Sequence, residues 1–185
     1  MNERVTCRGQ QYALLPEGYW HLTDPSGLVL NNAFVSEGIC RSVFAVNRMP
    51  GLAKAVSPYG LRSMQDKKEH CWETVRQSEN DNLPSRIGAV FLLETEELAK
   101  KLNALWFGAE QRIQLRARVI AGSRLHTADA SWLDCTEESW NEYATRYWRG
   151  DMSDNPLPEV LVDGIVYFPD WRGSPFGVGA GLVPR

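Results

Sequence analysis

The sequence predicts an α+β fold in a single domain, because short apolar strands are mixed with a few amphipathic helices and no segment repeats. The chain has 185 residues, of which 43% are hydrophobic. This length is enough for one well-packed core and short for two. We therefore predict one domain over residues 1–178. The end of the chain, Leu182–Arg185, resembles the remnant of a thrombin-cleavable tag, so residues 179–185 are set apart from functional reasoning.

Four segments have the pattern of strands. The continuous apolar run Ile87–Leu93 is typical of a strand covered on both faces. Residues 113–119 alternate between apolar and polar side chains, which predicts a half-buried strand with a basic outer face. Tyr19–Thr23 is a short strand that begins after a turn and ends at one. Val160–Phe168 is either one strand or a hairpin broken at the turn dipeptide Asp163-Gly164.

Three segments are predicted as helices. Thr95 is a suitable cap for a helix whose apolar side holds Leu98, Leu102, Leu105 and Trp106. Gln65–Glu79 has a narrow apolar face on an otherwise polar helix, and a last helix with an aromatic face starts after Thr136. From Leu28 to Tyr59 the periodicity is poor, which indicates loops with one or two short helices.

Charge and composition exclude several classes of function. The net charge of −3 and the pI of about 5.7 provide no basic field for a phosphate backbone or an acidic membrane, so we expect no general nucleic-acid binding. No apolar run approaches the roughly 20 residues that span a bilayer, and the first residues lack the pattern of a signal peptide. We therefore expect no membrane partner and a cytoplasmic location where the protein is made.

The common signatures of chemistry are missing from the sequence. The four cysteines form no Cys-x-x-Cys pair and no two histidines have metal-ligand spacing, so we predict free thiols and no metal site. Asp151, Ser153 and Asn155 have the spacing of a calcium loop, but Pro156 stands where that loop needs glycine and Val162 where it needs glutamate. The sequence has no phosphate loop, no dinucleotide fingerprint, no metalloprotease helix and no nucleophile elbow.

Polar residues precede apolar runs in two places, Pro84–Phe91 and Tyr147–Val162. An enzyme holds polar groups at a cleft in this way, and a loop that leads into a core strand has the same pattern. The residues alone leave both interpretations open.

Several short motifs follow one another in an order that occurs in a known superfamily. In chain order they are Trp20-His21-Leu22-Thr23, Glu73-x-x-Arg76, Pro84-Ser85-Arg86, Val90-Phe91, Asp129 after an alternating strand, Tyr147-Trp148-x-Gly150 and Glu159-Val160-Leu161. This order resembles an uncharacterised bacterial family of the ADP-ribosyltransferase-like superfamily. The resemblance covers roughly residues 19–166 and implies a split pair of small, strongly curved β-sheets with peripheral helices, with NAD+ in the cleft between the sheets.

The resemblance implies roles for particular residues. His21 and Thr23 match the His-x-Thr pair that contacts the dinucleotide in the branch with histidine on the first strand, and His21 is expected to act in catalysis as well. A histidine beside a tryptophan is also typical of simple aromatic packing. Other members carry Ser or Tyr on the next cleft strand, and Ser85, Arg86 and Phe91 lie in that neighbourhood as expected NAD-binding residues.

Glu159 matches the catalytic carboxylate of the superfamily. A fixed anion in a poorly hydrated cleft stabilises the oxocarbenium-like transition state that forms when the glycosidic bond breaks. A glutamate at the start of a strand is also an ordinary loop residue, and we expect no buried partner of opposite charge beside it. Arg86 either holds a pyrophosphate bidentately, caps the preceding helix, or pairs with Glu73 or Glu69. Leu157 stands where many transferases have a second Glu or Gln, which argues against modification of protein arginine.

The expected function is therefore NAD+-dependent mono-ADP-ribosyl transfer, in a bacterial toxin or effector, with delivery to another cell left open. NAD+ is the substrate and nicotinamide the leaving group. The acceptor is a protein, a nucleic acid or a small molecule, and the loops that select it cannot be read from the sequence. The alternative is a non-catalytic interaction module of the same fold with Trp132, Trp148 and Trp171 on its partner surface.

Overall fold

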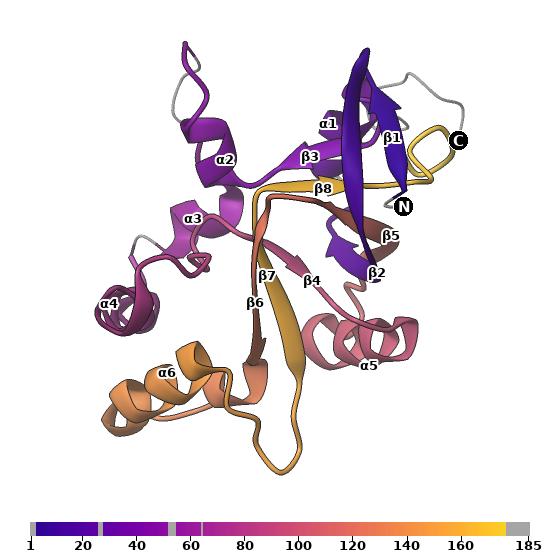
Figure 1. The fold of residues 1–185 in the computed structure, drawn as a ribbon. Coiled ribbons are helices and arrows are strands. Elements are labelled where there is room, and N and C mark those ends of the chain that lie inside the picture. Colours follow the sequence, from indigo (N-terminus) through magenta and orange to yellow (C-terminus); the bar gives the residue numbers. More distant parts are fainter. Residues whose placement is uncertain (1–2, 26–27, 52–54, 64, 177–185) are drawn as a thin grey trace. The chain divides into compact units, whose positions relative to one another are not determined.

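The computed structural model describes residues 3–25, 28–51, 55–63 and 65–176 of the chain (Figure 1). The predicted tag remnant at 179–185 lies outside these residues. The chain forms two compact units from interleaved segments, and the structure determines each unit by itself. Unit 1 consists of the described residues of Met1–Arg41, Leu92–Ser123 and Ile165–Arg185, and unit 2 of those of Ser42–Phe91 and Arg124–Gly164.

Unit 1 contains an antiparallel sheet of five strands in the order β1-β2-β5-β8-β3. The long strand β2 pairs with β1 on one side and β5 on the other, and its register shifts between Leu14 and Gly18. Pro16 has no N–H for a ladder hydrogen bond, which explains an irregularity at this point. The strands are β1 (Arg4–Cys7), β2 (Gln10–Thr23), β3 (Ile39–Arg41), β5 (Ile113–Ile120) and β8 (Ile165–Tyr167).

Two helices, α1 (Leu28–Val35) and α5 (Glu96–Phe107), accompany this sheet in unit 1. A small core cluster is formed by side chains from β1, β2, β3 and the end of β5. These buried residues are Cys7, Tyr12, Leu14, Ile39 and Ile120.

The N-cap of α5 is confirmed, but the apolar face predicted for this helix is partly wrong. The Thr95 hydroxyl accepts a hydrogen bond from the Leu98 N–H at 3.1 Å. Leu105 and Trp106 are exposed, whereas Asn103 is buried. The Asn103 amide bonds both the N–H and the C=O of Arg112 at 2.8 Å, so a polar side chain with satisfied partners occupies the inner face.

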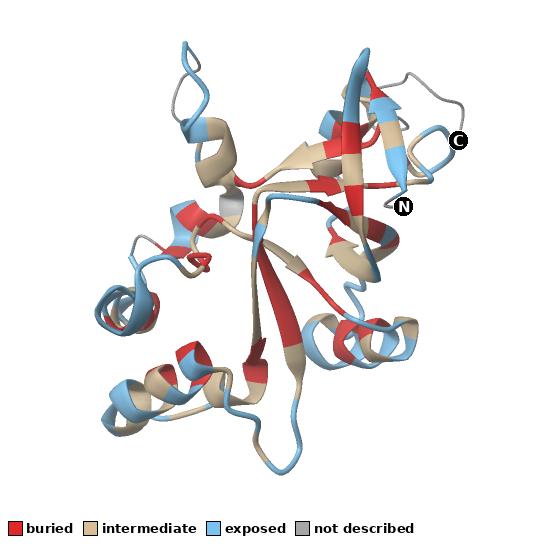
Figure 2. Ribbon diagram, in the orientation of Figure 1, coloured by how far each residue is buried: buried red, intermediate tan, exposed pale blue. Residues whose placement is uncertain are grey.

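Unit 2 holds a second sheet, with strand order β4-β7-β6, and most of the helices. Strand β7 is buried along almost its whole length, as the red ribbon in Figure 2 shows. The elements are α2 (Val43–Asn47), α3 (Pro58–Ser63), α4 (Lys67–Asn80), β4 (Val90–Leu92, whose last residue belongs to unit 1), β6 (Arg124–Asp129), two 3-10 turns (Ala130–Leu133 and Glu137–Ser139), α6 (Trp140–Arg149) and β7 (Pro158–Asp163).

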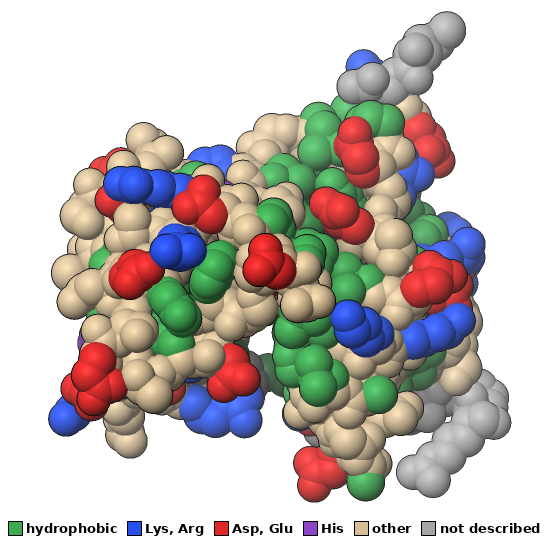
Figure 3. Space-filling view, turned by 90° about the horizontal axis from the view of Figure 1, so that it is seen from below, with side chains coloured by type: hydrophobic (Ala, Val, Ile, Leu, Met, Phe, Trp, Pro, Cys, Tyr) green, Lys and Arg blue, Asp and Glu red, His purple; other side chains and the backbone are tan. Residues whose placement is uncertain are grey.

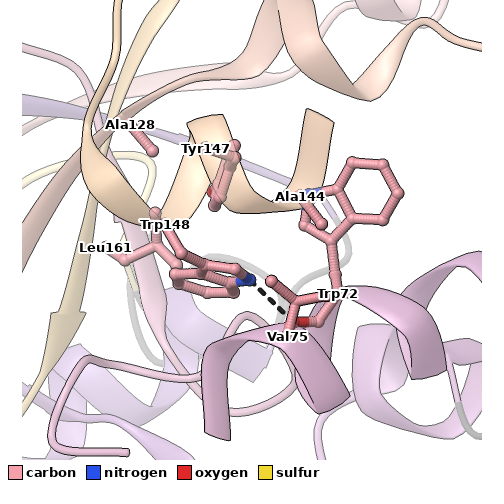
Figure 4. Close-up of a cluster of buried hydrophobic side chains, with 7 residues drawn as sticks. All are labelled: Trp72, Val75, Ala128, Ala144, Tyr147, Trp148 and Leu161. Atoms are coloured by element: carbon pink, nitrogen blue, oxygen red, sulfur yellow. Dashed lines mark hydrogen bonds between the residues drawn. The ribbon is translucent and has the colours of Figure 1, made fainter. Parts of the chain in front are cut away.

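The core of unit 2 joins α4 and α6 to the sheet (Figure 4). The indole N–H of Trp148 on α6 donates to the backbone carbonyl of Trp72 on α4 at 2.7 Å, so the two helices share a hydrogen bond inside an apolar cluster. The buried members are Trp72, Val75, Ala128, Ala144, Tyr147, Trp148 and Leu161.

The α+β class is confirmed, and three of the predicted strands need correction. The run Ile87–Leu93 contains only a three-residue strand, because Ser85 accepts backbone hydrogen bonds from Gly88 and Ala89 in a turn. Strand β2 starts at Gln10, well before the predicted start at Tyr19. Residues 160–168 divide at Gly164 into β7 and β8, which belong to different sheets, so the hairpin alternative is wrong.

The predictions for the remaining helices and for β5 hold with small changes. Helix α4 begins after Asp66, whose carboxylate accepts from the Lys68 N–H at 2.8 Å. Strand β5 has the predicted half-buried pattern. Thr136 precedes a 3-10 turn and makes no capping hydrogen bond through its side chain, and α6 begins later, at Trp140. No helix in the described part of the chain is long and apolar enough to cross a membrane.

Candidate functional site

A buried cluster of charged and phenolic side chains lies in unit 2 around Arg86. The guanidinium of Arg86 donates from Nη1 to Glu159 Oε1 at 2.5 Å and to the Tyr147 hydroxyl at 2.7 Å. From Nη2 it donates to the Tyr59 hydroxyl at 3.1 Å, and from Nε to Glu69 Oε2 at 3.3 Å. Arg86 is only 6% exposed and Glu159 only 4%, so this ion pair is shielded from water. We call these five residues the Arg86 cluster.

The two tyrosines of the Arg86 cluster link each carboxylate to the arginine. The Tyr147 hydroxyl accepts from Arg86 and donates to Glu159 Oε1 at 2.6 Å. The Tyr59 hydroxyl accepts from Arg86 and donates to Glu69 Oε1 at 2.5 Å. Each carboxylate therefore has one charged and one phenolic donor, which offsets part of the cost of removing charges from water.

Five different elements supply the cluster. Glu159 is the second residue of β7, Tyr147 is on α6, and Glu69 is on the inner face of α4. Tyr59 is on α3, and Arg86 is in the turn before β4. Residues that are distant in sequence thus meet only when unit 2 is folded.

Aromatic rings enclose the guanidinium. The centre of the Arg86 guanidinium lies 5.3 Å from the ring centroid of Phe91 and 5.2 Å from that of Tyr147. The Phe91 ring also makes an edge contact with Tyr59 at 5.6 Å. A cation near an aromatic face is attracted by the ring quadrupole, so Phe91 contributes to holding Arg86 in place.

Protonation within the Arg86 cluster follows from burial and neighbouring charges. Burial alone would lower the pKa of Arg86, but Tyr147, Glu159, Tyr59 and Glu69 together raise it well above its usual value. Burial raises the pKa of Tyr59 to about 12 and that of Tyr147 well above its usual value. Both phenols are therefore protonated donors at neutral pH. With one guanidinium and two carboxylates, the cluster has a formal charge of −1.

Ser85 belongs to a neighbouring network rather than to the Arg86 cluster itself. Its hydroxyl donates to Glu73 Oε2 at 2.7 Å. Glu73 also accepts from Arg76, at 3.0 and 2.7 Å, and Arg76 donates to two backbone carbonyls of the following turn. Burial alone would raise the pKa of Glu73, but the hydrogen bonds from Arg76 and Ser85 lower it. This network fastens the turn that carries Arg86 to the end of α4.

Asp129 fixes the loop that leads to Glu159. Its carboxylate accepts from the backbone N–H groups of Ser131 at 2.9 Å, Ser153 at 2.8 Å and Leu157 at 2.8 Å. The residue is fully buried. Burial alone would raise the pKa of Asp129, but the hydrogen bonds from Leu157, Ser153 and Ser131 lower it to about 2. The loop therefore enters β7 at a defined position, directly before Glu159.

The predicted site residues fall in both units. Ser85, Arg86, Phe91 and Glu159 all lie in unit 2, where Arg86 contacts Phe91 and Glu159. His21 and Thr23 lie in unit 1, at the end of β2. Their side chains point to one face of the strand because they are two residues apart.

His21 and Thr23 have defined surroundings within unit 1. The His21 ring packs at 5.7 Å from Phe168, with a tilt of 48° between the two planes. Thr23 is 4% exposed and pairs with Ile113 of β5. This aromatic contact is the packing alternative considered from the sequence, and a contact to a dinucleotide stays a prediction.

One expectation about Glu159 is wrong. The sequence suggested no buried partner of opposite charge, whereas Arg86 is such a partner. The alternative that Arg86 pairs with Glu69 is confirmed, at 3.3 Å, while Glu73 pairs with Arg76 instead. Arg86 follows Pro84 and precedes a glycine-containing turn, so nothing local in the sequence identifies its partners.

Three members of the Arg86 cluster were not among the predicted site residues. Tyr147 begins the motif Tyr147-Trp148-x-Gly150, to which the sequence assigns no role, and Tyr59 ends the segment of poor periodicity. Glu69, on a polar helix, was expected only as an alternative partner of Arg86. The signal that was present is its spacing: Glu69, Trp72 and Arg76 recur at i, i+3 and i+7, which places charged residues on the same face as an apolar one.

The described residues form neither a single-sign charged face in Figure 3 nor a metal-binding group. On the face drawn in Figure 3, the described acidic and basic side chains are interspersed. Among the described residues, no group of three or more His, Cys, Asp or Glu side chains is arranged to hold a metal ion. The four cysteines are free, and only Cys7 of these is fully buried.

A family model described as "Protein of unknown function (DUF2441)" matches residues 36–169. No curated protein matches the sequence. The matched segment contains Ser85, Arg86, Phe91 and Glu159, and it begins after His21 and Thr23. It spans every residue of unit 2.

Proposed function

Because the chain belongs to the DUF2441 family, whose description assigns no activity, we propose a function from the site: NAD+-dependent mono-ADP-ribosyl transfer with release of nicotinamide. The observation that carries the proposal is the environment of Glu159. A carboxylate at the start of a core strand is buried, and one of its oxygens is held by Arg86 at 2.5 Å and Tyr147 at 2.6 Å. The motif order and the presence of a separate small sheet in each unit support the same proposal.

The proposed reaction uses Glu159 as an electrostatic group. The bond between the ribose carbon and the nicotinamide nitrogen breaks, and nicotinamide leaves with the bonding electrons. The ribose then carries oxocarbenium-like positive charge until a nucleophilic acceptor forms the new bond and loses a proton. A carboxylate that is already held in position stabilises this charge without reorganising. Electrostatic catalysis in enzymes arises mainly from such preorganised groups.

The charge of the Arg86 cluster fits this role. Arg86 balances one of the two carboxylates, so the cluster keeps one formal negative charge in a shielded place. Both described donors to Glu159 meet Oε1, and within the described residues no hydrogen bond is placed on Oε2. In the proposed reaction, Oε2 is the oxygen that meets a ribose hydroxyl or the developing positive charge, because the described donors to Glu159 all bind Oε1.

The non-catalytic interaction module is the second candidate, although Trp148, expected on its partner surface, is buried in the core of unit 2. A specific observation favours this candidate as well. Glu159, Arg86 and Tyr147 satisfy one another, and all three are buried. A buried ion pair with this geometry is sufficient as a structural element of unit 2, without any substrate. The two candidates differ in whether Glu159 affects chemistry beyond its effect on stability.

The deciding experiment measures nicotinamide release from NAD+ in single turnovers, with thermal unfolding of each protein in parallel. Glu159→Gln keeps the shape and removes the charge, so release should fall by about 100-fold or more while the fold is retained. Glu69→Gln is the matched control, because it removes the other carboxylate bound to Arg86. Equal losses in both variants, or no release by the wild-type protein, would favour the interaction module.

The acceptor requires a separate experiment, since the loops that select it carry no recognisable signature. Labelled NAD+ is incubated with the protein and a cell lysate, and the labelled species are identified. Label that appears with wild-type protein and disappears with Glu159→Gln identifies a protein, nucleic acid or small-molecule acceptor.

A further inference from the structure

A pocket separate from the Arg86 cluster lies within unit 2, and it has the lining of an anion site. Its volume is about 300 Å³, which is at the lower end of small-molecule pockets. Three arginines contribute to its walls, together with apolar side chains and one exposed acid. The residues that matter for the argument are Arg48, Arg76, Arg124, Phe44, Leu83 and Asp81.

The charge of this pocket is set by one shared carboxylate. Asp163 accepts from Arg48 at 2.9 and 3.0 Å, from the Ser42 hydroxyl at 2.7 Å, and from Arg124. Burial alone would raise the pKa of Asp163, but the hydrogen bonds from Arg48, Ser42 and Arg124 lower it to about 2, so it is ionised at neutral pH. One negative charge thus faces two guanidinium groups, and one positive charge is in excess at this wall.

The two guanidinium groups have capacity for a further partner. The side chains of Arg48 and Arg124 are 53% and 45% exposed, while that of Asp163 is 1% exposed. A guanidinium has five N–H donors. In the described contacts Arg48 donates two hydrogen bonds to Asp163, and Arg124 donates one to Asp163 and one to the Asn82 carbonyl. Asp163 therefore holds both side chains in place from the buried side and leaves donors for an anion on the open side.

Two further charged residues, Arg76 and Asp81, line the pocket. Arg76 is paired with Glu73, so that pair adds no net charge. Asp81 is exposed to solvent, and charges in water are screened more strongly than buried ones. The positive charge of the pocket is therefore located at the wall formed by Arg48 and Arg124, and Asp81 opposes it from the solvent side.

An apolar wall completes the pocket. Phe44 and Leu83 both line it. The Phe44 ring packs directly on Gly88, where an added Cβ would lie 2.7 Å from two ring carbons. The missing side chain of Gly88 thus allows the close approach of the Phe44 ring that forms this wall.

We propose that this pocket binds an organic phosphate monoester, with the phosphate at Arg48 and Arg124 and the carbon part against Phe44 and Leu83. Guanidinium groups suit phosphate because their N–H donors match its oxygens in pairs. A volume of about 300 Å³ admits a small metabolite and excludes a nucleic-acid duplex or a folded protein segment. The proposal uses none of the five residues of the Arg86 cluster, but Ser85, which also lines the pocket, is one of the expected NAD-binding residues.

Calorimetry with AMP, adenosine and inorganic phosphate tests the proposal. AMP should bind, inorganic phosphate should bind at least about tenfold more weakly because it lacks the apolar part, and adenosine should not bind at millimolar concentration. Arg124→Gln should weaken AMP binding by about tenfold or more, since it removes a charge-assisted contact. The control is Arg149→Gln. Arg149 pairs with Glu79 and does not line the pocket, so this variant should bind AMP as the wild type does.

A second variant keeps the test decisive if Arg124→Gln fails to fold. Asp81→Asn removes the exposed negative charge from the lining without touching Asp163, and it should strengthen AMP binding. Glu159→Gln, which tests the proposed transferase, should bind AMP unchanged, and Arg124→Gln should release nicotinamide from NAD+ at the wild-type rate, so the two proposals succeed or fail separately. The pocket assignment is overturned if AMP does not bind, if adenosine binds equally well, or if neither Arg124→Gln nor Asp81→Asn changes the affinity.

Discussion

Arg86 Nη1 and Glu159 Oε1 lie 2.5 Å apart, although 73 residues separate them in the chain. The pair connects the turn before β4 to the start of β7, and α3, α4 and α6 each add one side chain around it. A contact of such long sequence separation forms only when the intervening segments are in place. The same pair is thus a sensitive reporter of whether unit 2 is correctly folded.

Removing the arginine should destabilise the protein more than removing either carboxylate. Arg86→Met leaves two buried carboxylates without a cation, and we expect a loss of about 3–5 kcal/mol in the free energy of unfolding. Glu159→Gln leaves a neutral Arg86–Glu69 pair and should cost about 1–3 kcal/mol. Urea unfolding of the two variants gives the order. A larger loss for Glu159→Gln would contradict the formal charge of −1 assigned to the cluster.

Stability should fall as the pH is lowered from about 4 towards 2, and Asp129 should account for part of the loss. Its pKa is lowered to about 2 in the folded protein, so its contribution is fully present above the unfolded-state pKa of about 3.9 and disappears as the pH falls through the folded value. This contribution is at most about 3 kcal/mol. Asp129→Asn should flatten the pH dependence of urea unfolding between pH 4 and 2.

The control for this pH dependence is Asp154→Asn, which changes the same charge on an exposed loop position. The variant should show the wild-type pH profile. An unchanged profile in Asp129→Asn would show that the three backbone N–H bonds do not hold the carboxylate in its charged form.

The stability of the protein should depend more on Asn103, on the inner face of α5, than on Trp106. Asn103→Ala leaves the N–H and C=O of Arg112 without their partner and should cost about 1–3 kcal/mol. Trp106→Ala removes a ring that is 42% exposed and should cost less than about 1 kcal/mol. Thermal unfolding of both variants measures the difference. A larger loss of stability in Trp106→Ala would support the apolar face that periodicity predicts for α5.

NAD+ should raise the melting temperature of the wild-type protein, because a ligand that binds only the folded state stabilises it in proportion to the logarithm of its concentration over Kd. His21→Ala should reduce this shift while leaving the fold intact. His70→Ala, an exposed histidine on α4, serves as the control. A full shift in His21→Ala would mean that His21 serves only to pack against Phe168.

Local patterns predicted the elements whose periodicity and caps lie within a few residues. Helix α4 and strand β5 follow from the spacing of Trp72 and Val75 and from the alternation that starts at Ile113. The first half of β2 could not be read, because Pro16 and Gly18 interrupt its pattern and the strand continues through a register shift. Hydrophobic periodicity also gives the wrong buried face for α5, because it assigns tryptophan to the interior and asparagine to the surface. It does not take account of the backbone groups of Arg112 to which the Asn103 amide is hydrogen-bonded.

The candidate site was predictable only in part for a related reason. Glu159 and Arg86 were identified as residues that begin apolar runs, and that signal is local. Their partnership with Tyr147, Tyr59 and Glu69 depends on contacts between residues 10–73 positions apart, which no single-sequence pattern encodes. A buried partner for Glu159 follows only from the general expectation that buried charges are paired.

The loop that leads to Glu159 is tethered to Asp129 through backbone N–H groups, which every amino acid except proline supplies. Position 157 can therefore change side chain widely while the chain still delivers Glu159 to the same place, whereas the Ser153 hydroxyl also bonds Asp129 and Ser131. Such a loop is a natural region for diversification: relatives could alter what approaches the carboxylate without moving it. A library randomised at residues 152–157 should retain the fold in most members, with proline at 153 or 157 as the main exception.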